Sequence, residues 1–276
     1  MRAGRRILPR CSATSMIPAA ILAAVDGTDS SWHPSLIAGL QAVDRANPQY
    51  LSALAQDDYL PTGGRLLAAF AQPLESVRYV LVGEGPYPRA ASATGVCFMD
   101  GAVDVLWSDK GLSKSVNRAT SLRNFIKMLL VADGTLTSGH TSGEAMVIAG
   151  TQALQSGSSS IQTLPQLQHN LSRNGFLLLN AALVFRSHVP AVRDARAWMP
   201  FLQTILAALS DRPSRPTLVL WGKIAAQLDG LTGMDRFPRL VAEHPYNLSF
   251  IENGSMQKLF GPMRLLRLSA PIPANR

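Results

Sequence analysis

Four short apolar runs, each followed at once by a glycine, an amide or a histidine-containing loop, constrain the fold of this chain most. They are residues 79–82, 176–180, 218–222 and 239–243. Short Leu- and Val-rich runs bounded by Gly and Pro are typical of buried strands. Loops at the carboxyl ends of parallel strands carry the chemistry of many α/β proteins. The pattern therefore predicts an α/β fold whose functional residues directly follow these strands.

The loop after the first strand is the most informative of the four. Residues 83–88 read Gly-Glu-Gly-Pro-Tyr-Pro, and residues 95–98, Gly-Val-Cys-Phe, follow soon afterwards. Gly-x-Gly-Pro is also an ordinary turn, so this segment alone indicates little. The other strands end in Asn180, in Gly222 and in residues 244–249, which read His-Pro-Tyr-Asn-Leu-Ser. The order of these endings carries more information than any one of them.

In this order and spacing, the segments resemble the uracil-DNA glycosylase superfamily, and most of all its first family. That family carries a Gly-Gln-Asp-Pro-Tyr-His loop, a following Gly-x-x-Phe, a Leu-Leu-Leu-Asn strand and a His-Pro-Ser-Pro-Leu-Ser loop. Residues 60–70 and 120–124 are similar to two further family segments, and the resemblance covers residues 32–266. It implies a three-layer α/β/α sandwich around a central four-stranded, mostly parallel sheet.

The resemblance also implies a pocket for one base that has been turned out of the DNA stack. Phe98 would stack on the base, Asn180 would pair with the O4 and N3–H edge of uracil, and Tyr87 would exclude the 5-methyl group of thymine. His244, as a neutral imidazole, would donate to uracil O2 while negative charge develops there. The structural alternatives are a core phenylalanine, a strand-end cap and a loop histidine.

The same resemblance implies contacts with the DNA backbone and the minor groove. Ser121 begins a predicted helix whose free N–H groups favour phosphate, and Ser249 would add a second phosphate contact. Pro245 belongs to the loop that enters the minor groove, and Leu248 would fill the gap left by the extruded base. Residues 246–247, Tyr-Asn, replace the Ser-Pro of the family loop, so the shape of this loop is open.

One family residue is missing from the first loop. Gly85 stands where the family has the Asp that positions the attacking water. Glu84 is adjacent, but neighbouring side chains of an extended segment point to opposite faces, so it does not simply substitute. Asp100 and Asp104 are weaker candidates. We assign Glu84, Gly85 and His244 to the catalytic centre, because other branches of the superfamily lack this Asp and still cleave.

The composition bounds the partners and cofactors. A net charge of +8 suits a polyanionic partner such as DNA, although many basic proteins bind none. Two cysteines, Cys11 and Cys97, supply neither a disulfide framework nor the four ligands of an iron-sulfur cluster. Five scattered histidines show no zinc-ligand spacing, and no apolar run reaches the roughly 18 residues of a membrane span. We expect a cytoplasmic monomer without metal or cofactor that acts on single- and double-stranded DNA containing uracil.

The chain is predicted to form a single domain at residues 32–270, followed by a tail at 271–276. Residues 1–31 carry early arginines ahead of an apolar run that imitates a signal peptide. Pro18 within that run favours instead a flexible basic extension or a start at Met16. Residues 132–168 are rich in Gly, Ser and Thr around a helical piece at 143–154, and they predict an enlarged surface connection.

The primary hypothesis is a monofunctional DNA glycosylase that flips uracil out of DNA and hydrolyses its N-glycosidic bond to leave an abasic site. Loss of the loop Asp favours an alternative, a catalytically weak or inactive module that recognises uracil or bent DNA. The retained base-pocket residues favour the enzyme. A third possibility is a glycosylase for another deaminated base such as hypoxanthine, because the loop lacks two bulky side chains.

Overall fold

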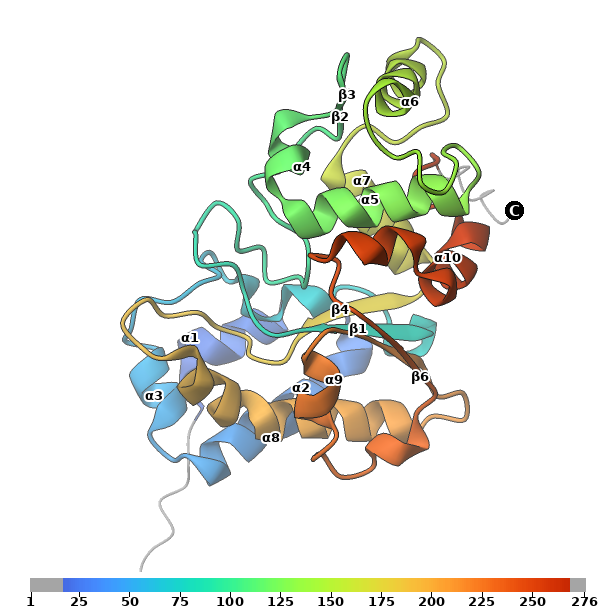
Figure 1. Ribbon diagram of the computed structural model, residues 1–276. Helices are drawn as coiled ribbons and strands as arrows, with labels where there is room; N and C mark the ends of the chain where they lie inside the picture. Colours follow the sequence, from blue (N-terminus) through green and yellow to red (C-terminus); the bar gives the residue numbers. More distant parts are fainter. Residues whose placement is uncertain (1–16, 269–276) are drawn as a thin grey trace, which may run out of the picture.

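The four predicted strands form one sheet at the centre of the computed structural model, which describes residues 17–268 (Figure 1). They are β1 (Tyr79–Gly83), β4 (Phe176–Asn180), β5 (Thr217–Trp221) and β6 (Arg239–Ala242). Their order in the sheet is β4-β1-β5-β6, and every neighbouring pair is parallel. The predicted sheet is confirmed, and all four carboxyl ends therefore lie at the same edge.

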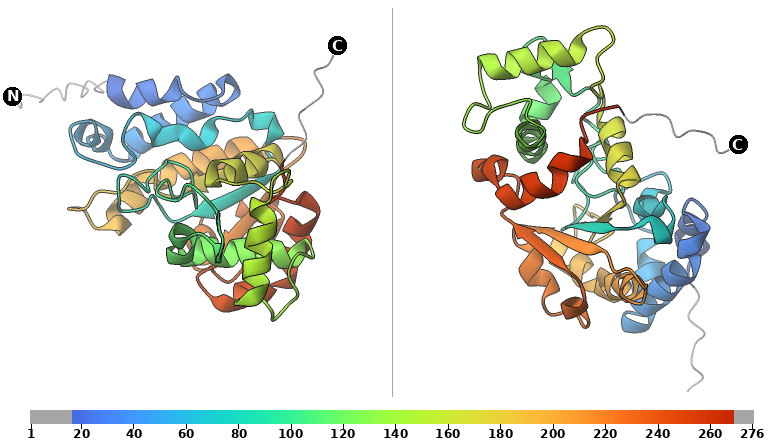
Figure 2. Two further views of the ribbon diagram at one scale, coloured as in Figure 1. Left: turned by 90° about the horizontal axis from the view of Figure 1, so that it is seen from above. Right: turned by 90° about the vertical axis from the view of Figure 1, so that its right-hand side faces the viewer.

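Helices cover both faces of the sheet, which explains why the strands read as nearly continuous apolar runs. One face packs against α2 (His33–Ala46) and α8 (Ala191–Ser210), and the other against α5 (Thr120–Ala132) and α10 (Gly254–Phe260). Figure 2 shows the resulting three layers. Alternate residues of each strand enter the two cores, so that Leu177 and Leu179 face one layer while Leu178 faces the other.

The remaining elements surround these layers. The helices are α1 (Ala19–Leu22), α3 (Tyr50–Leu54), α4 (Lys114–Arg118), α6 (Glu144–Leu154), α7 (Leu164–Arg173) and α9 (Ile224–Leu228). A short antiparallel hairpin pairs β2 (Trp107–Ser108) with β3 (Gly111–Leu112). The 3-10 turns are Ala23–Val25, Ser30–Trp32, Arg65–Phe70, Leu74–Ser76, Met234–Arg236, Leu248–Glu252 and Gly261–Met263.

The connection at residues 132–168 contains the expected helix, α6, which packs against the β2-β3 hairpin. Met146, Ala149 and Ala153 on α6 are buried in the second core, which lies on the α5 and α10 side of the sheet. A Cβ atom on Gly150 would lie 2.6 Å from the Gly111 Cα atom, so a glycine at each position allows the helix to approach the hairpin closely. The connection is thus packed onto the domain through a small apolar contact.

The folded domain begins earlier than residue 32. Residues 17–31 form α1 and adjacent 3-10 turns, and Ile21, Ala24 and Val25 are buried. The predicted flexible extension at 1–31 is therefore wrong for residues 17–31, because the apolar run that imitates a signal peptide supplies side chains to the core. The early arginines, Cys11, Met16 and the predicted tail at 271–276 lie outside the described residues. No helix in the described part is long and apolar enough to cross a membrane.

Candidate active site

A cavity of about 240 Å³ opens at the carboxyl edge of the sheet, where β1 and β4 end. Phe98, Asn180 and His244 all line this cavity, although they come from distant parts of the chain. Their predicted convergence is confirmed, while the role of each side chain stays a prediction. The other predicted site residues that line the cavity are Glu84, Gly85, Tyr87 and Ser121.

Asn180 is the last residue of β4 and pairs in register with Gly83, the last residue of β1. It is only 4% exposed, and its side-chain amide makes no hydrogen bond to any group within residues 17–268. A Cβ atom on Gly83 would lie 3.0 Å from the Asn180 Oδ1 atom and 2.5 Å from the Cys97 Sγ atom. Glycine at this position therefore lets both side chains approach β1 and leaves the Asn180 amide available to the cavity.

The segment that carries Phe98 is held against β4 and against the second core. The Cys97 N–H donates to the Leu178 carbonyl at 3.0 Å, and burial raises the pKa of the Cys97 thiol to about 12. Phe98 itself has a positive φ of 67°, a conformation that costs a non-glycine residue about 1 to 3 kcal/mol. Edge-on ring contacts with Phe125 and Trp221, at 5.4 and 5.2 Å, hold it there. Phe98 is thus a core residue on one side and a cavity wall on the other.

His244 follows β6 and is oriented by its own loop. Its Nδ1 atom accepts a hydrogen bond from the Tyr246 N–H at 3.1 Å, so the neutral ring carries its hydrogen on Nε2. Burial lowers the pKa of His244 below its ordinary 6.5, although the Glu84 carboxylate opposes this shift. The imidazole is therefore neutral at pH 7 and has a free N–H donor. A Cβ atom on Gly222 would lie 2.9 Å from the His244 Cβ atom, so glycine makes room for the ring.

Glu84 and Gly85 both line the cavity, just beyond the extended part of β1. The chain bends at Glu84, directly after the strand. The bend is fixed by the Ala181 and Ala182 N–H groups, which donate to the Gly83 and Glu84 carbonyls at 2.8 and 3.0 Å. Alternation holds only along an extended strand, so the geometry of β1 does not decide where the Glu84 side chain points.

Gly85 has both the space and the backbone conformation for a side chain. A Cβ atom at this position would lie 3.6 Å from the Ala182 carbonyl oxygen and 3.7 Å from the Ala182 Cβ atom, which are ordinary contacts. Gly85 is also absent from the residues with positive φ. The missing side chain is therefore a feature of the sequence rather than a steric requirement of the loop.

The two weaker candidates for the missing carboxylate do not line the cavity. Asp100 is buried, accepts a hydrogen bond from the Ala102 N–H at 2.9 Å, and lies 3.6 Å from Arg89. Asp104 is exposed. Neither is placed to act on a base in this cavity. Among residues 17–268, no group of three or more His, Cys, Asp and Glu side chains is arranged to hold a metal ion.

Tyr87 and Ser121 complete the predicted wall. Burial, more than the neighbouring groups, raises the pKa of the Tyr87 phenol, so the ring remains uncharged near neutrality. Ser121 lies in the first turn of α5, where no side chain caps the helix. The leading N–H groups of α5 therefore have no capping side chain.

No family model matches the chain. The crystal structure of a UNG from Nitratifractor salsuginis superimposes with a TM-score of 0.81 and 40% sequence identity, covering 90% of this chain and 96% of that one. The uracil-DNA glycosylase 1 of Streptomyces coelicolor is 29% identical over 192 residues, 69% of this chain and 68% of its own length. This chain belongs to the uracil-DNA glycosylase superfamily. A crystal structure of mimivirus uracil-DNA glycosylase, 17% identical with a TM-score of 0.51, shares the fold over 80% of this chain.

The predicted DNA-entering loop, residues 244–249, exposes two large apolar side chains. Leu248 is 69% exposed and Tyr246 is 68% exposed, while Ser249 is also exposed. Pro245 is buried, so in this conformation little of its side chain is accessible for the expected DNA contact. The position of Tyr246 beside Leu248 is a feature that sequence reasoning had left open, because residue 246 departs from the family motif.

A second, larger groove of about 650 Å³ shares only the Glu84–Pro86 segment with the first. Its other walls come from the β4–α8 connection, α8 and α9, and include the apolar residues Val192 and Met199. Sequence reasoning missed this groove because no motif marks it. It contains none of the base-pocket residues of this superfamily member, so the smaller cavity remains the candidate active site.

Proposed function

We propose that this protein excises uracil from DNA by flipping the nucleotide into the cavity and hydrolysing its N-glycosidic bond. The Asn180 amide carries the proposal, because it is buried, makes no hydrogen bond to the described protein, and lines a cavity beside an aromatic ring. An amide that faces a cavity without a protein partner is free to pair with a ligand that offers both a donor and an acceptor. Uracil offers N3–H to the amide oxygen and O4 to the amide N–H.

The proposed reaction follows from the groups around this amide. Phe98 stacks on the extruded pyrimidine, which contributes roughly 1 to 3 kcal/mol. The bond between the sugar C1′ and uracil N1 breaks, and its electron pair moves onto the uracil ring. The Nε2–H of neutral His244 donates to O2, where this charge gathers. A water molecule adds to C1′, and the proton that it releases passes through solvent to the uracil anion, which leaves an abasic site and free uracil.

Glu84 is the proposed counter-charge for the sugar cation. Glu84 lines the cavity, and its charge is close enough to His244 to raise the pKa of that imidazole. A carboxylate here offsets positive charge on C1′ through space, while Gly85 leaves the water without the side chain that the family uses to position it. The proposed enzyme therefore hydrolyses slowly.

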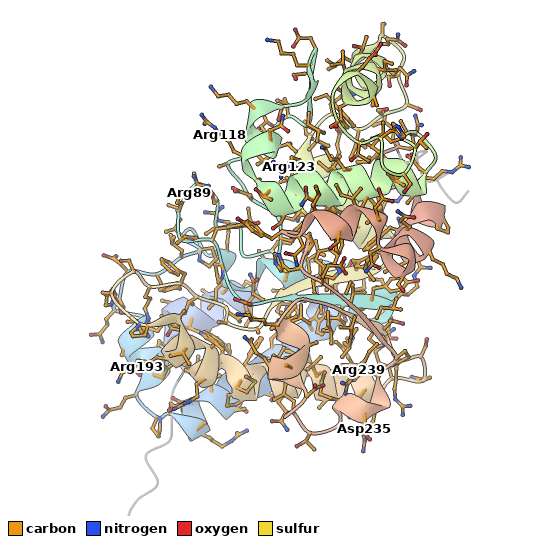
Figure 3. All side chains as sticks on the ribbon, viewed as in Figure 1. Arg89, Arg118, Arg123, Arg193, Asp235 and Arg239 are labelled. Atoms are coloured by element: carbon orange, nitrogen blue, oxygen red, sulfur yellow. The ribbon has the colours of Figure 1, made fainter. Side chains whose placement is uncertain are left out.

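The DNA backbone is proposed to cross the mouth of the cavity. Ser121 and Ser249 supply phosphate contacts, and Leu248 fills the gap that the extruded base leaves in the base stack. Figure 3 shows Arg118 and Arg123 beside α4 and the start of α5, and neither forms an ion pair with a carboxylate within residues 17–268. Guanidinium groups without counter-ions next to Ser121 suit the phosphates that flank the flipped nucleotide.

Replacing Arg118 by Gln should reduce the salt dependence of DNA binding. Each lost phosphate contact lowers the slope of log K against log salt by about 0.9 for duplex DNA. Fluorescence anisotropy with a labelled duplex over a salt series measures this slope. The control is Arg215→Gln, which removes the same charge next to β5 at the amino edge of the sheet. Equal slopes for both variants and the parent would exclude Arg118 from the DNA interface.

Excision should fall as the pH drops below neutrality, and Glu84→Gln should move this acid limb to lower pH. A proton on His244 must enter Nδ1, where it displaces the hydrogen bond from the Tyr246 N–H. The Glu84 charge raises the pKa of His244, so its removal lowers that pKa further and keeps the ring neutral in more acidic solution. Single-turnover rates between about pH 5 and 8 measure the shift. An acid limb that moves to higher pH or stays in place would show that the Glu84 charge does not raise the pKa of His244.

The same depressed pKa predicts a loss of stability in acid. The unfolded chain takes up the His244 proton near pH 6.5, while the folded protein resists it. The free energy of unfolding therefore starts to fall as the pH drops below 6.5, and the loss is complete once the pH is below the lower pKa of the folded protein.

Oligonucleotides that contain uracil, hypoxanthine or a thymine mismatch test the proposed function. The purified protein is incubated with single-stranded and duplex forms, and alkali then cleaves any abasic site. Cleavage at uracil supports the proposal. Cleavage at hypoxanthine alone would reassign the substrate, and no cleavage of any substrate would indicate the recognition module.

A further inference from the structure

A buried amide on helix α5 donates hydrogen bonds to the DNA-entering loop. Asn124 is 1% exposed, and its Nδ2 atom donates to the Pro245 carbonyl at 2.8 Å. The same atom lies 3.3 and 3.4 Å from the carbonyls of Tyr246 and Asn247. One side chain on α5 thus contacts three consecutive carbonyls that are more than a hundred residues away in the chain.

These three carbonyls belong to the backbone that joins His244 to Leu248. The two apolar side chains at the tip, Tyr246 and Leu248, are exposed and gain little packing from the domain. The ends of the loop are closed by a hydrogen bond from the Asn253 Nδ2 atom to the Glu243 carboxylate at 2.8 Å. Between those ends, polar contacts hold the tip, and Asn124 supplies side-chain hydrogen bonds from α5. The turn that follows, Leu248–Glu252, also packs on α5.

The position of Asn124 on α5 links two parts of the proposed site. Ser121 and Asn124 are three residues apart, so they lie on the same side of the helix about one turn from each other. Ser121 lines the cavity, and Asn124 holds the loop. A rigid helix therefore sets the distance between the phosphate contact and the residues that enter the stack.

We propose that Asn124 is a positioning residue. Before DNA binds, it holds the loop so that Leu248 is placed to enter the duplex and the His244 donor is placed at the pocket. The inference rests on the proposed function. A loop that is already ordered loses less conformational entropy on binding and keeps the His244 donor aligned with the pocket. Uracil in a duplex needs both the wedge and the donor, whereas uracil in a single strand needs mainly the donor.

Asn170 provides a matched control elsewhere in the molecule. It is buried on α7, and its Nδ2 atom donates to the Leu265 and Arg267 carbonyls at 2.8 Å each. It does not line the cavity. A purely structural role for buried amides predicts the same consequences for both residues, and a positioning role predicts consequences at Asn124 alone.

The first measurement is hydrogen exchange of the free proteins, followed by mass spectrometry. Asn124→Leu should raise exchange in peptides covering residues 243–252 by at least 10-fold, and Asn170→Leu should leave those peptides unchanged. Asn124→Asp and Asn170→Asp preserve side-chain shape and serve if the leucine variants do not fold. Unchanged exchange at 243–252 in a folded Asn124 variant would overturn the proposal whether or not the protein excises uracil.

The second measurement is single-turnover excision from duplex and single-stranded DNA. Asn124→Leu should slow duplex excision at least 10-fold more than single-strand excision, while Asn170→Leu should keep the parental ratio. In a Leu248→Ala background the extra duplex defect of Asn124→Leu should largely vanish, because coupled residues are not additive. An equal loss on both substrates, or full additivity with Leu248→Ala, would overturn it. Failure of the parent to cleave would count against the proposed function instead.

Discussion

Replacing Asn180 by Asp should lower uracil excision by roughly 5- to 150-fold, which corresponds to about 1 to 3 kcal/mol of transition-state stabilisation. An ionised carboxylate accepts the N3–H of uracil but has no hydrogen to donate to O4. The effect should approach the upper end of the range, because residue 180 is 4% exposed and an unsatisfied group there is poorly hydrated. Single-turnover rates on a uracil duplex measure the loss.

The same substitution should improve the relative excision of cytosine, whose exocyclic amine donates to the new carboxylate. Burial raises the pKa of a carboxyl group, and a neutral acid would donate like the amide, so the comparison belongs at about pH 8, where the introduced group is ionised. Asn180→Ala is the control, since it removes both hydrogen bonds without a charge and should favour neither base. An Asn180→Asp protein with the parental rate and preference would show that the base is recognised elsewhere.

Introducing Asp at position 85 should accelerate uracil excision by one or more powers of ten, each equal to about 1.4 kcal/mol of barrier. Gly85 lines the cavity, its backbone lies outside the positive φ region, and a Cβ atom would meet only ordinary contacts with Ala182. The new carboxylate can therefore orient water and offset charge on the sugar without distorting the loop. Single-turnover kinetics at saturating enzyme report the chemical step.

Two variants separate charge from shape at this position. Gly85→Asn offers nearly the same volume without the charge, and Gly85→Ala tests the effect of stiffening the loop. Only the Asp variant should show the full acceleration. A folded Gly85→Asp protein with an unchanged rate would indicate that water is positioned by another group, with Glu84 as the first candidate to replace in that background.

The chain pattern predicted the sheet well because strand signals are local. Each of the four strands is a short apolar run that ends in a Gly, an amide or a His-Pro loop, and parallel packing brings those ends to one edge. The meeting of Phe98, Asn180 and His244 in one cavity followed from their positions after separate strands together with the family resemblance. Such features depend on residue identity and spacing, which the sequence contains directly.

Other features required contacts between distant segments. The bend at Glu84 is fixed by N–H groups of residues 181–182, so the alternation rule for an extended segment does not apply to this residue. The sequence pattern of residues 17–31 indicates an extension, whereas the fold buries several of their apolar side chains in the core. Asn124 reads as an ordinary helix residue, and only the fold places its amide under the carbonyls of residues 245–247.

The sequence by itself therefore determined the four strands, their order along the chain and the chemical types of the residues at the strand ends. The tertiary structure decided which acidic residue lines the cavity, which tautomer His244 adopts and which amide supports the loop. The physical reason is the distance along the chain over which each effect acts. Strand and turn preferences act over a few residues, whereas the direction of a side chain and the pKa of a buried group depend on whichever segments the fold brings beside them.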